Sequence, residues 1–253
     1  ALDREARKRG NSTYFPDRVV PMLPFELSAD ACSLKEGQDR QCMAVEIMFD
    51  KSGTKQSHTF LRAIMRSAGA LSYEEAQQAI DGKPSKRAAP LLNSVLKPLW
   101  AAYAALSKAR EKRGPLELDL PERKVEIATD GTVSGIRTKE RFDAHKLVEE
   151  LMIQANVCAA EELEKRKTPL LYRIHDAPSD AKIAALSEFL KTLDIKWPLG
   201  ERTQTHRFNR LLVEFGESDN AEAVSEIVLR TQSQASYSPE NIGHFGLNLK
   251  KYA

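Results

Sequence analysis

The feature that most restricts the fold is the helical pattern between Asp143 and Lys165. Leu147, Leu151, Ala155 and Cys158 recur along one stripe of this segment, which is the spacing of a helix with a single apolar face. Asp143 stands at its start, where a short acidic side chain can cap free backbone N–H groups. We therefore predict a long amphipathic helix over these residues.

Other helices are predicted from their start and stop signals. Ser72 and Glu75 have capping-box spacing before a short helix that begins at Tyr73 and ends before Gly82. Apolar residues at helical spacing predict a second long helix from Leu91 to Gly114, kinked at Pro98. Further helices are expected over residues 1–9, 179–193, 207–215 and 221–234.

Strand patterns lie between these helices. Residues 41–49 and 59–65 read as a hairpin around a glycine-containing turn at 50–54, and Asp130-Gly131 marks a second hairpin within 115–137. Residues 171–175 read as a buried strand. Prolines at 16, 21 and 24 make residues 11–27 extended and irregular. The mixture predicts a single α+β unit with no clear internal boundary.

Composition excludes several classes of protein. The three cysteines, Cys32, Cys42 and Cys158, lack the spacing of a disulfide framework or a zinc site, which favours a reduced, cytoplasmic setting. No secretory signal or membrane-spanning run is present in the sequence. A net charge of +2 does not by itself indicate nucleic-acid binding.

Local basic clusters end three of the predicted helices. They comprise Arg4, Arg7, Lys8 and Arg9; Lys108, Arg110, Lys112 and Arg113; and Lys165, Arg166 and Lys167. Cations complement the dipole of a helix at its C-terminal end, so solvated surface charge is the favoured interpretation.

Generic motifs indicate no catalytic centre. The five histidines lack helical metal-pair spacing, and neither HExxH, GxSxG nor a phosphate loop occurs. Glu149 lies beside the apolar stripe of its helix, where an inward-facing acid needs a protein or ligand partner. Tyr14 and Phe15, near Arg18, could stack on an unpaired base or fill a core edge. The hydroxyl of Tyr73 could face solvent, backbone or a ribose.

Four ordered strings are more specific: LDREARKRGNSTYFPDRVVPMLPFELSADACSL, FDAHKLVEELMIQANVCAA, LYRIHDAPS and SQASYSPENIGHFGLNLKKYA. Together they resemble the catalytic RNB domain of the ribonuclease R/ribonuclease II family over nearly the whole chain. The resemblance implies an α+β fold in which small mixed sheets are packed by several helices. It also implies a hydrolase that degrades single-stranded RNA processively from the 3′ end and releases nucleoside 5′-monophosphates.

The resemblance assigns roles to individual residues. Tyr14 in NSTYFP matches a tyrosine that stacks near the 3′-terminal nucleotides, and Tyr73 and Glu149 match positions that contact the terminal ribose. A ribose contact of this kind favours RNA over DNA. Leu118 stands where family members often carry a second aromatic clamp, so a weaker base contact is expected because leucine lacks a π-face.

The same resemblance places residues 1–253 as one RNB domain that is incomplete at both ends. The family's metal-binding aspartates would lie upstream, and an arginine of an SPIR stretch downstream, so we expect no catalytic residue and no Mg²⁺ ligand in this chain. The parent would be a magnesium-dependent, cytoplasmic and monomeric enzyme of RNA degradation, with cold-shock-like and S1-like barrels. The chain alone should be inactive and should bind RNA weakly.

A second hypothesis is a non-catalytic RNA-binding or regulatory protein built on a degenerate RNB scaffold. A third, an interaction module unrelated to RNA, has no positive sequence feature in its favour.

Overall fold

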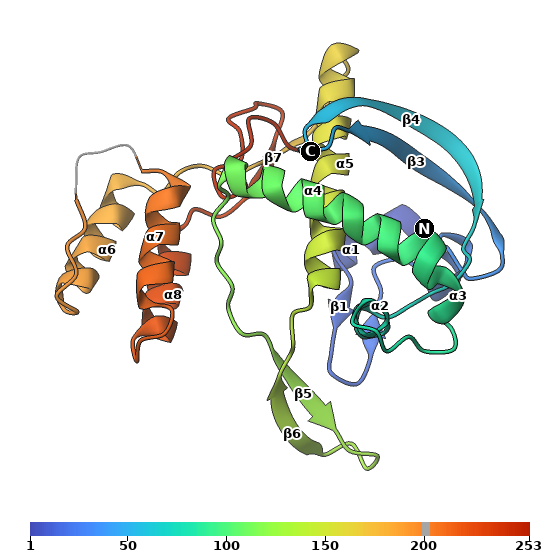
Figure 1. The fold of residues 1–253 in the computed structure, drawn as a ribbon, viewed down its shortest axis with the longest axis horizontal. Helices are drawn as coiled ribbons and strands as arrows, with labels where there is room; N and C mark the ends of the chain where they lie inside the picture. The colour runs from blue at the N-terminus through green and yellow to red at the C-terminus, as the bar shows by residue number, and fades with distance from the viewer. Residues whose placement is uncertain (199–202) are drawn as a thin grey trace. The chain divides into compact units, whose positions relative to one another are not determined.

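A computed structural model describes residues 1–198 and 203–253 (Figure 1). The described residues form two compact units. Unit 1 comprises residues 1–46, 59–100 and 121–146, and unit 2 comprises residues 47–58, 101–120 and 147–253. Both units are discontinuous in sequence, because the chain passes between them several times.

The described residues contain mainly helices and two-stranded sheets, which confirms the predicted α+β fold class. The α-helices are α1 (Leu2–Arg9), α2 (Tyr73–Ile80), α3 (Ala89–Leu91), α4 (Lys97–Arg113), α5 (Asp143–Lys165), α6 (Asp180–Lys191), α7 (Thr205–Phe215) and α8 (Ala221–Thr231). Two π-helical turns are η1 (Glu26–Ala31) and η2 (Leu92–Leu96). The sheets pair β1 (Thr13–Tyr14) with β2 (Val19–Val20), β3 (Asp39–Phe49) with β4 (Lys55–Arg66), β5 (Arg123–Ile127) with β6 (Val133–Thr138), and β7 (Tyr172–Ile174) with β8 (Ser236–Ser238).

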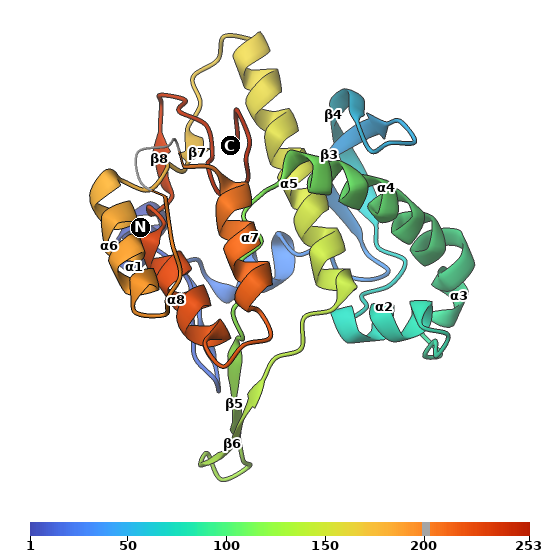
Figure 2. The same cartoon turned by 60° about the vertical axis from the view of Figure 1, so that its left-hand side comes forward.

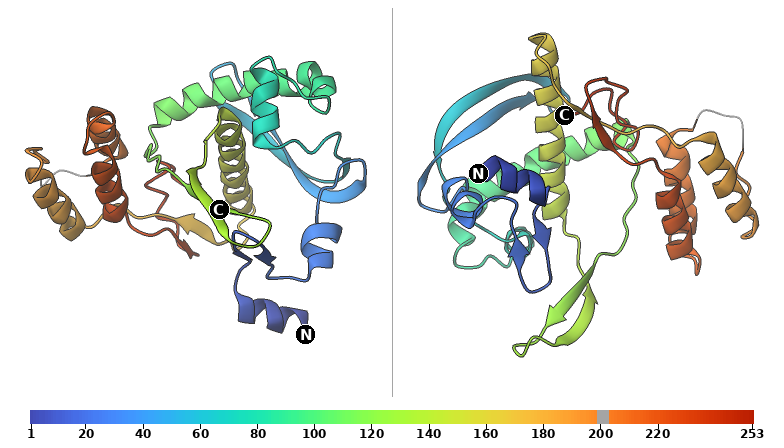
Figure 3. Two further views of the ribbon diagram at one scale, coloured as in Figure 1. Left: turned by 90° about the horizontal axis from the view of Figure 1, so that it is seen from below. Right: turned by 180° about the vertical axis from the view of Figure 1, so that it is seen from behind.

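The N-terminal part of unit 1 follows the predicted order of helix and extended chain (Figure 3). Gly10 ends α1 with a φ of 73°, and its N–H donates to the Ala6 carbonyl at 2.9 Å. Such a conformation is open to glycine because it has no Cβ. Beyond it, the proline-rich segment forms only the two-residue strands β1 and β2 before η1.

Capping chemistry sets the start of α2. The Ser72 hydroxyl accepts from the Glu75 N–H at 3.1 Å, and the Glu75 carboxylate accepts from the Ser72 N–H at 3.0 Å. This reciprocal pair confirms the predicted capping box and places Tyr73 as the first residue of the helix. A small apolar cluster of Ala79, Ala88 and Leu96 anchors α2 within unit 1.

The predicted single helix from Leu91 to Gly114 is instead three consecutive segments, α3, η2 and α4. Pro98 is the second residue of α4, immediately after the π-helical turn. Proline lacks the N–H that a regular turn requires and crowds the carbonyl four residues earlier, so the preceding turn widens. Gly114 ends α4 as predicted, with a φ of 62°.

The hairpin β5–β6 turns at Asp130-Gly131, where Gly131 has a φ of 85°. Residues 116–120, which lie within the segment 115–137 predicted to contain a hairpin, pair with no other strand among the residues described. Their backbone has other partners, because the Leu116 N–H donates to the Gly246 carbonyl at 2.7 Å and the Glu117 N–H to Asn209 Oδ1 at 2.8 Å.

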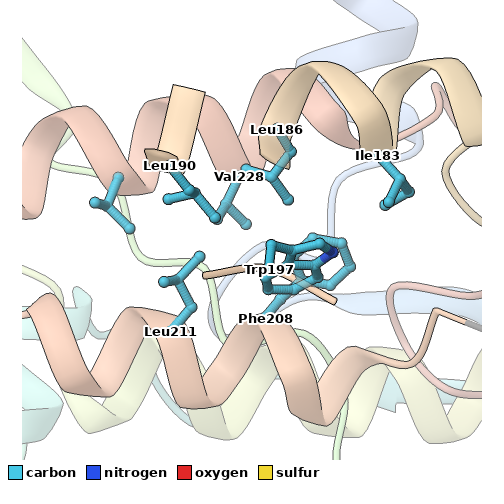
Figure 4. Close-up of a cluster of buried hydrophobic side chains, with 8 residues drawn as sticks. Ile183, Leu186, Leu190, Trp197, Phe208, Leu211 and Val228 are labelled. Atoms are coloured by element: carbon cyan, nitrogen blue, oxygen red, sulfur yellow. The ribbon is translucent and has the colours of Figure 1, made fainter. Parts of the chain in front are cut away.

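The core of unit 2 lies between α6, α7 and α8 (Figure 1, Figure 2). Figure 4 shows side chains from these helices pointing toward one another around Trp197, whose ring lies 5.2 Å from that of Phe208. The buried set is Ile183, Leu186, Leu190, Trp197, Phe208, Leu211, Val224 and Val228. Full burial of each large apolar side chain contributes about 1.5–3 kcal/mol, so this cluster stabilises the three-helix arrangement.

A histidine pair joins β7 to the C-terminal segment of unit 2. His175 Nδ1 accepts from the Gly246 N–H at 2.9 Å, and His175 Nε2 lies 2.8 Å from the Ser233 carbonyl. The carbonyl can only accept, so Nε2 carries the proton and the imidazole is neutral. The His244 ring lies 5.0 Å from the His175 ring, and its Nδ1 accepts from the Leu247 N–H at 3.1 Å. Both rings therefore act as acceptors for backbone N–H groups.

Among the described residues, no helix combines the length and apolar character that a membrane crossing requires.

Candidate nucleic-acid interface

Tyr14 is displayed on the β1–β2 hairpin of unit 1. It pairs with Val19 across the hairpin, and its side chain is 77% exposed. The adjacent Phe15 ring is covered by Arg18, whose Cζ lies 4.8 Å from the ring centroid. Tyr14 therefore does not fill a core edge, and its ring is accessible to a planar ligand such as a base.

Tyr73 is held by the first turn of α2 and by the start of α5, within unit 1. Its ring stacks on His145 with a centroid distance of 4.0 Å and an interplanar angle of 23°. His145 Nδ1 accepts from the Phe142 N–H at 3.1 Å, and Gln77 Oε1 accepts from the Ala144 N–H at 3.1 Å. These contacts fix the tyrosine ring from one side, while the residue as a whole stays partly exposed.

Glu149 and Glu150, adjacent in unit 2, have opposite environments. The Glu149 side chain is 38% exposed, whereas that of Glu150 is 1% exposed. The inward-facing acid of this helix is therefore Glu150 and not Glu149, which corrects the sequence-based interpretation. Consecutive helical residues differ by about 100° in direction, so only one of the two can face the core.

Two arginines of α4 neutralise these acids. Arg113 binds Glu150 at two points, Nη1 to Oε1 and Nη2 to Oε2, each at 3.1 Å. Arg110 Nη1 lies 3.3 Å from Glu150 Oε2 and 3.4 Å from Glu149 Oε1. The reading of this basic cluster as solvated surface charge is thus wrong for both arginines, while Lys108 and Lys112 remain exposed. The ion pairs of Arg110 and Arg113 could not be predicted from the sequence, because their partners lie on a different helix, about 40 residues further along the chain.

Leu118 is partly buried and packs against the apolar cluster of unit 2. That packing gives it a structural role beside any contact with a base. Tyr14 and Tyr73 lie in unit 1, whereas Leu118 and Glu149 lie in unit 2.

The described residues supply no ready cluster of ligands for a divalent cation. Within residues 1–198 and 203–253, no group of three or more histidine, cysteine, aspartate or glutamate side chains is arranged to hold a metal. The described carboxylate with the deepest burial, Glu150, is bound by two guanidinium groups. Oxygen ligands for Mg²⁺ are usually acids that remain open to the ion, so Glu150 does not fit that role.

The model of the RNB domain family matches residues 1–253. The chain belongs to the RNB domain family. Ribonuclease R of Escherichia coli is 40% identical to this RNB chain over 254 residues, which are 100% of the chain and 31% of the relative. Relatives from Vibrio parahaemolyticus and Aquifex aeolicus, 38% and 37% identical, are also named ribonuclease R, and the chain spans about a third of the length of these three proteins.

Solved structures of ribonuclease R are also similar to the chain. Ribonuclease R of Mycoplasma genitalium in complex with ribose-methylated single-stranded RNA has a TM-score of 0.91 and 28% identity to the RNB chain, covering 99% of it and 39% of the solved chain. The complex of the same protein with double-stranded RNA has a TM-score of 0.92 and 28% identity, with coverage of 99% and 45%. The fold of the RNB chain is thus that of the matched part of this ribonuclease R.

Proposed function

We propose that this chain is the RNA-holding part of a 3′-to-5′ exoribonuclease that hydrolyses single-stranded RNA processively to nucleoside 5′-monophosphates. The observation that carries the proposal is the match of the RNB family over all 253 residues, together with an RNA-bound structural neighbour. The parent protein would act in RNA degradation, in the cytoplasm and as a monomer.

The site residues take the roles that their surroundings allow. The exposed ring of Tyr14 would stack on a base near the 3′ end, because such stacking requires an accessible π-face. Tyr73 and Glu149 would bind the terminal ribose, since a phenol and a carboxylate can both hydrogen-bond a 2′-hydroxyl. Leu118 stays a prediction as a base clamp, and its packing against the unit 2 cluster limits how far it could move toward a base.

Catalysis would depend on residues outside this segment. Phosphodiester hydrolysis with Mg²⁺ needs carboxylates that hold the ion and orient water, and the described residues do not supply such a cluster. We therefore propose that the ligands of the metal are contributed by other parts of the parent protein and that the 253-residue chain alone is inactive.

The test compares the 253-residue chain with the protein encoded by the whole open reading frame that contains it, called here the full-length protein. Each is incubated with Mg²⁺ and 5′-labelled single-stranded RNA, and products are resolved on a gel. We expect only the full-length protein to shorten RNA stepwise from the 3′ end, with nucleoside 5′-monophosphates released.

Other outcomes contradict the proposal in different ways. A full-length protein that binds RNA without shortening it would support the non-catalytic RNA-binding alternative. Activity of the 253-residue chain by itself would mean that a metal site exists within these residues.

A further inference from the structure

Arg110 connects Glu149, the residue proposed to bind the ribose, to the buried carboxylate of Glu150 in unit 2. Its Nη1 is shared between Glu149 Oε1 at 3.4 Å and Glu150 Oε2 at 3.3 Å. The opposite edge of the same guanidinium binds Glu117, with Nε to Oε1 at 3.0 Å and Nη2 to Oε2 at 3.2 Å. One planar group therefore joins α4, α5 and the segment after Gly114.

The guanidinium itself is held in place by groups that cannot easily move. Glu150 is fixed by the two-point contact with Arg113 and by Gln154 Nε2, which donates to Oε1 at 2.8 Å. The backbone of Glu117 is fixed by its N–H bond to Asn209 Oδ1 at 2.8 Å. Arg110 is thus held by Glu117 on one side and by Glu150 on the other. Its contact with Glu149 therefore restrains the Glu149 side chain, and the position of Arg110 does not depend on Glu149.

Partial burial strengthens this restraint. The Arg110 side chain is only 18% exposed, so its ion pairs are less screened than those of surface residues. Burial works to lower the pKa of Arg110, but hydrogen bonding to Glu117 and the charges of Glu117, Glu149 and Glu150 outweigh it and the pKa is raised. The positive charge at this position is therefore permanent.

We infer that Arg110 is a positioning residue for Glu149, and that it thereby contributes to discrimination between a ribose and a 2′-deoxyribose at the 3′ terminus. This inference rests on the proposed function, in which Glu149 accepts a hydrogen bond from the 2′-hydroxyl. A hydrogen bond that discriminates must have its acceptor at a fixed place, since a mobile acceptor loses rotamer entropy when it binds. Arg110 supplies that fixed place without touching RNA.

The geometry requires arginine and not merely a cation. The guanidinium presents five donors in a rigid plane and can bind Glu117 along one edge while Nη1 faces the helix α5 acids. A lysine ammonium at the same position is a point charge on a flexible stem, so it can pair with one of these carboxylates but cannot span all of them. Arg110→Lys should therefore restore charge but only part of the discrimination.

The experiment measures binding by the full-length protein in EDTA, so that RNA is bound but not hydrolysed. Two labelled oligoribonucleotides are compared, which differ only in whether the 3′-terminal nucleotide carries a 2′-hydroxyl. The quantity of interest is the ratio of the two dissociation constants, deoxy over ribo. We expect Arg110→Met to lower this ratio by about threefold to tenfold, the effect of weakening one hydrogen bond, and Arg110→Lys to lower it less.

Two further variants distinguish a loss of Glu149 positioning from two other effects, the loss of a positive charge on α4 and a failure of the variant to fold. Lys108→Met removes one exposed positive charge from the same helix and should leave the ratio unchanged. Glu117→Gln removes the charge and one of the two acceptor oxygens at the far edge of the guanidinium. Because residue 117 is exposed, the variant should fold normally and lower the ratio in the same direction as Arg110→Met. If Arg110→Met does not fold, Glu117→Gln still tests the positioning role.

Glu149→Ala, which removes the acceptor oxygens, tests the ribose contact separately from the positioning role. If Glu149→Ala lowers the ratio but the Arg110 and Glu117 variants leave it unchanged, the positioning role is overturned and the proposed ribose contact stands. If none of the variants changes the ratio, the ribose contact itself is wrong. If Arg110→Met weakens binding of both oligonucleotides equally, Arg110 acts on affinity in general and not on the ribose.

Discussion

Arg113 and Glu150 form a two-point ion pair between α4 and α5, with both Nη–Oε distances at 3.1 Å and the carboxylate almost fully buried. Removing one partner of a buried pair leaves the other charge uncompensated, which costs about 3–5 kcal/mol. Glu150→Gln should therefore lower the free energy of unfolding of the full-length protein by about that amount, measured by urea titration followed by circular dichroism.

Glu188→Gln is the matched control for this prediction. Glu188 pairs with Lys191 on the surface, where an ion pair contributes about 0–1 kcal/mol. Equal effects of the two variants would mean that the buried pair is no more important to stability than a surface pair.

Tyr14→Ala should weaken binding of single-stranded RNA without changing stability. Loss of one base–aromatic stack costs about 1–3 kcal/mol, or roughly a fivefold to hundredfold rise in the dissociation constant. Fluorescence anisotropy in EDTA measures the affinity. Phe25→Ala is the control, because Phe25 is 70% exposed and follows in the same proline-rich region; a similar loss there would show that the effect is not specific to Tyr14.

Tyr73→Phe and Tyr73→Ala separate the ring of Tyr73 from its hydroxyl. Phenylalanine keeps the stack on His145 at 4.0 Å but removes the hydroxyl. We expect Tyr73→Phe to lower the preference for a ribose terminus by about fivefold, the effect of one hydrogen bond. Tyr73→Ala should in addition reduce total RNA affinity. A Phe variant with wild-type preference would mean that the hydroxyl does not meet the ribose.

Because His175 is buried and His244 is partly buried, we expect the free energy of unfolding to decrease in acid. Burial, and to a smaller extent the neighbouring His175, lower the pKa of His244 to about 4, and burial also lowers the pKa of His175. Because these histidines bind protons in the unfolded chain near pH 6.5 but not in the folded one, their contribution is complete above that pH and is lost as the pH falls toward 4.

The expected decrease attributable to His244 is about 2 kcal/mol between pH 7 and pH 4, with allowance for its partial exposure. Urea titrations at a series of pH values measure it. His244→Gln should flatten this part of the pH profile, and a variant with the same slope as the wild type would assign the loss to other groups.

Gly53 is required by close packing and by its backbone conformation together. A Cβ built there would lie 2.2 Å from the Ala105 carbonyl oxygen, and the φ of Gly53 is 77°. Gly53→Ala should cost about 3 kcal/mol or more. Gly82 has a φ of 87°, but no described atom outside its chain neighbours lies within 4 Å of the added Cβ, so Gly82→Ala should cost only about 1–2 kcal/mol. Thermal unfolding compares the two, and equal shifts would contradict the steric explanation.

Much of the local structure follows from the sequence alone because its causes are local. The capping box at Ser72 and Glu75, the glycine after α1 and the Asp130-Gly131 turn act within a few residues, so the predicted elements form where expected. The family, too, is readable from the order of the strings that carry its motifs. The sequence does not determine whether Tyr14 is exposed, because an aromatic ring suits both a core edge and an accessible surface that stacks on a base.

The tertiary structure decided which charges are buried and paired. Glu149 and Glu150 are identical in type and adjacent in sequence, and only the packing of α5 against α4 determines that Glu150 is enclosed while Glu149 stays partly exposed. Likewise, Arg110 is indistinguishable from Lys108 as a basic residue near a helix end until α5 brings two carboxylates to it. Long-range electrostatic pairing depends on distances between distant parts of the chain, and those distances are set by folding rather than by local pattern.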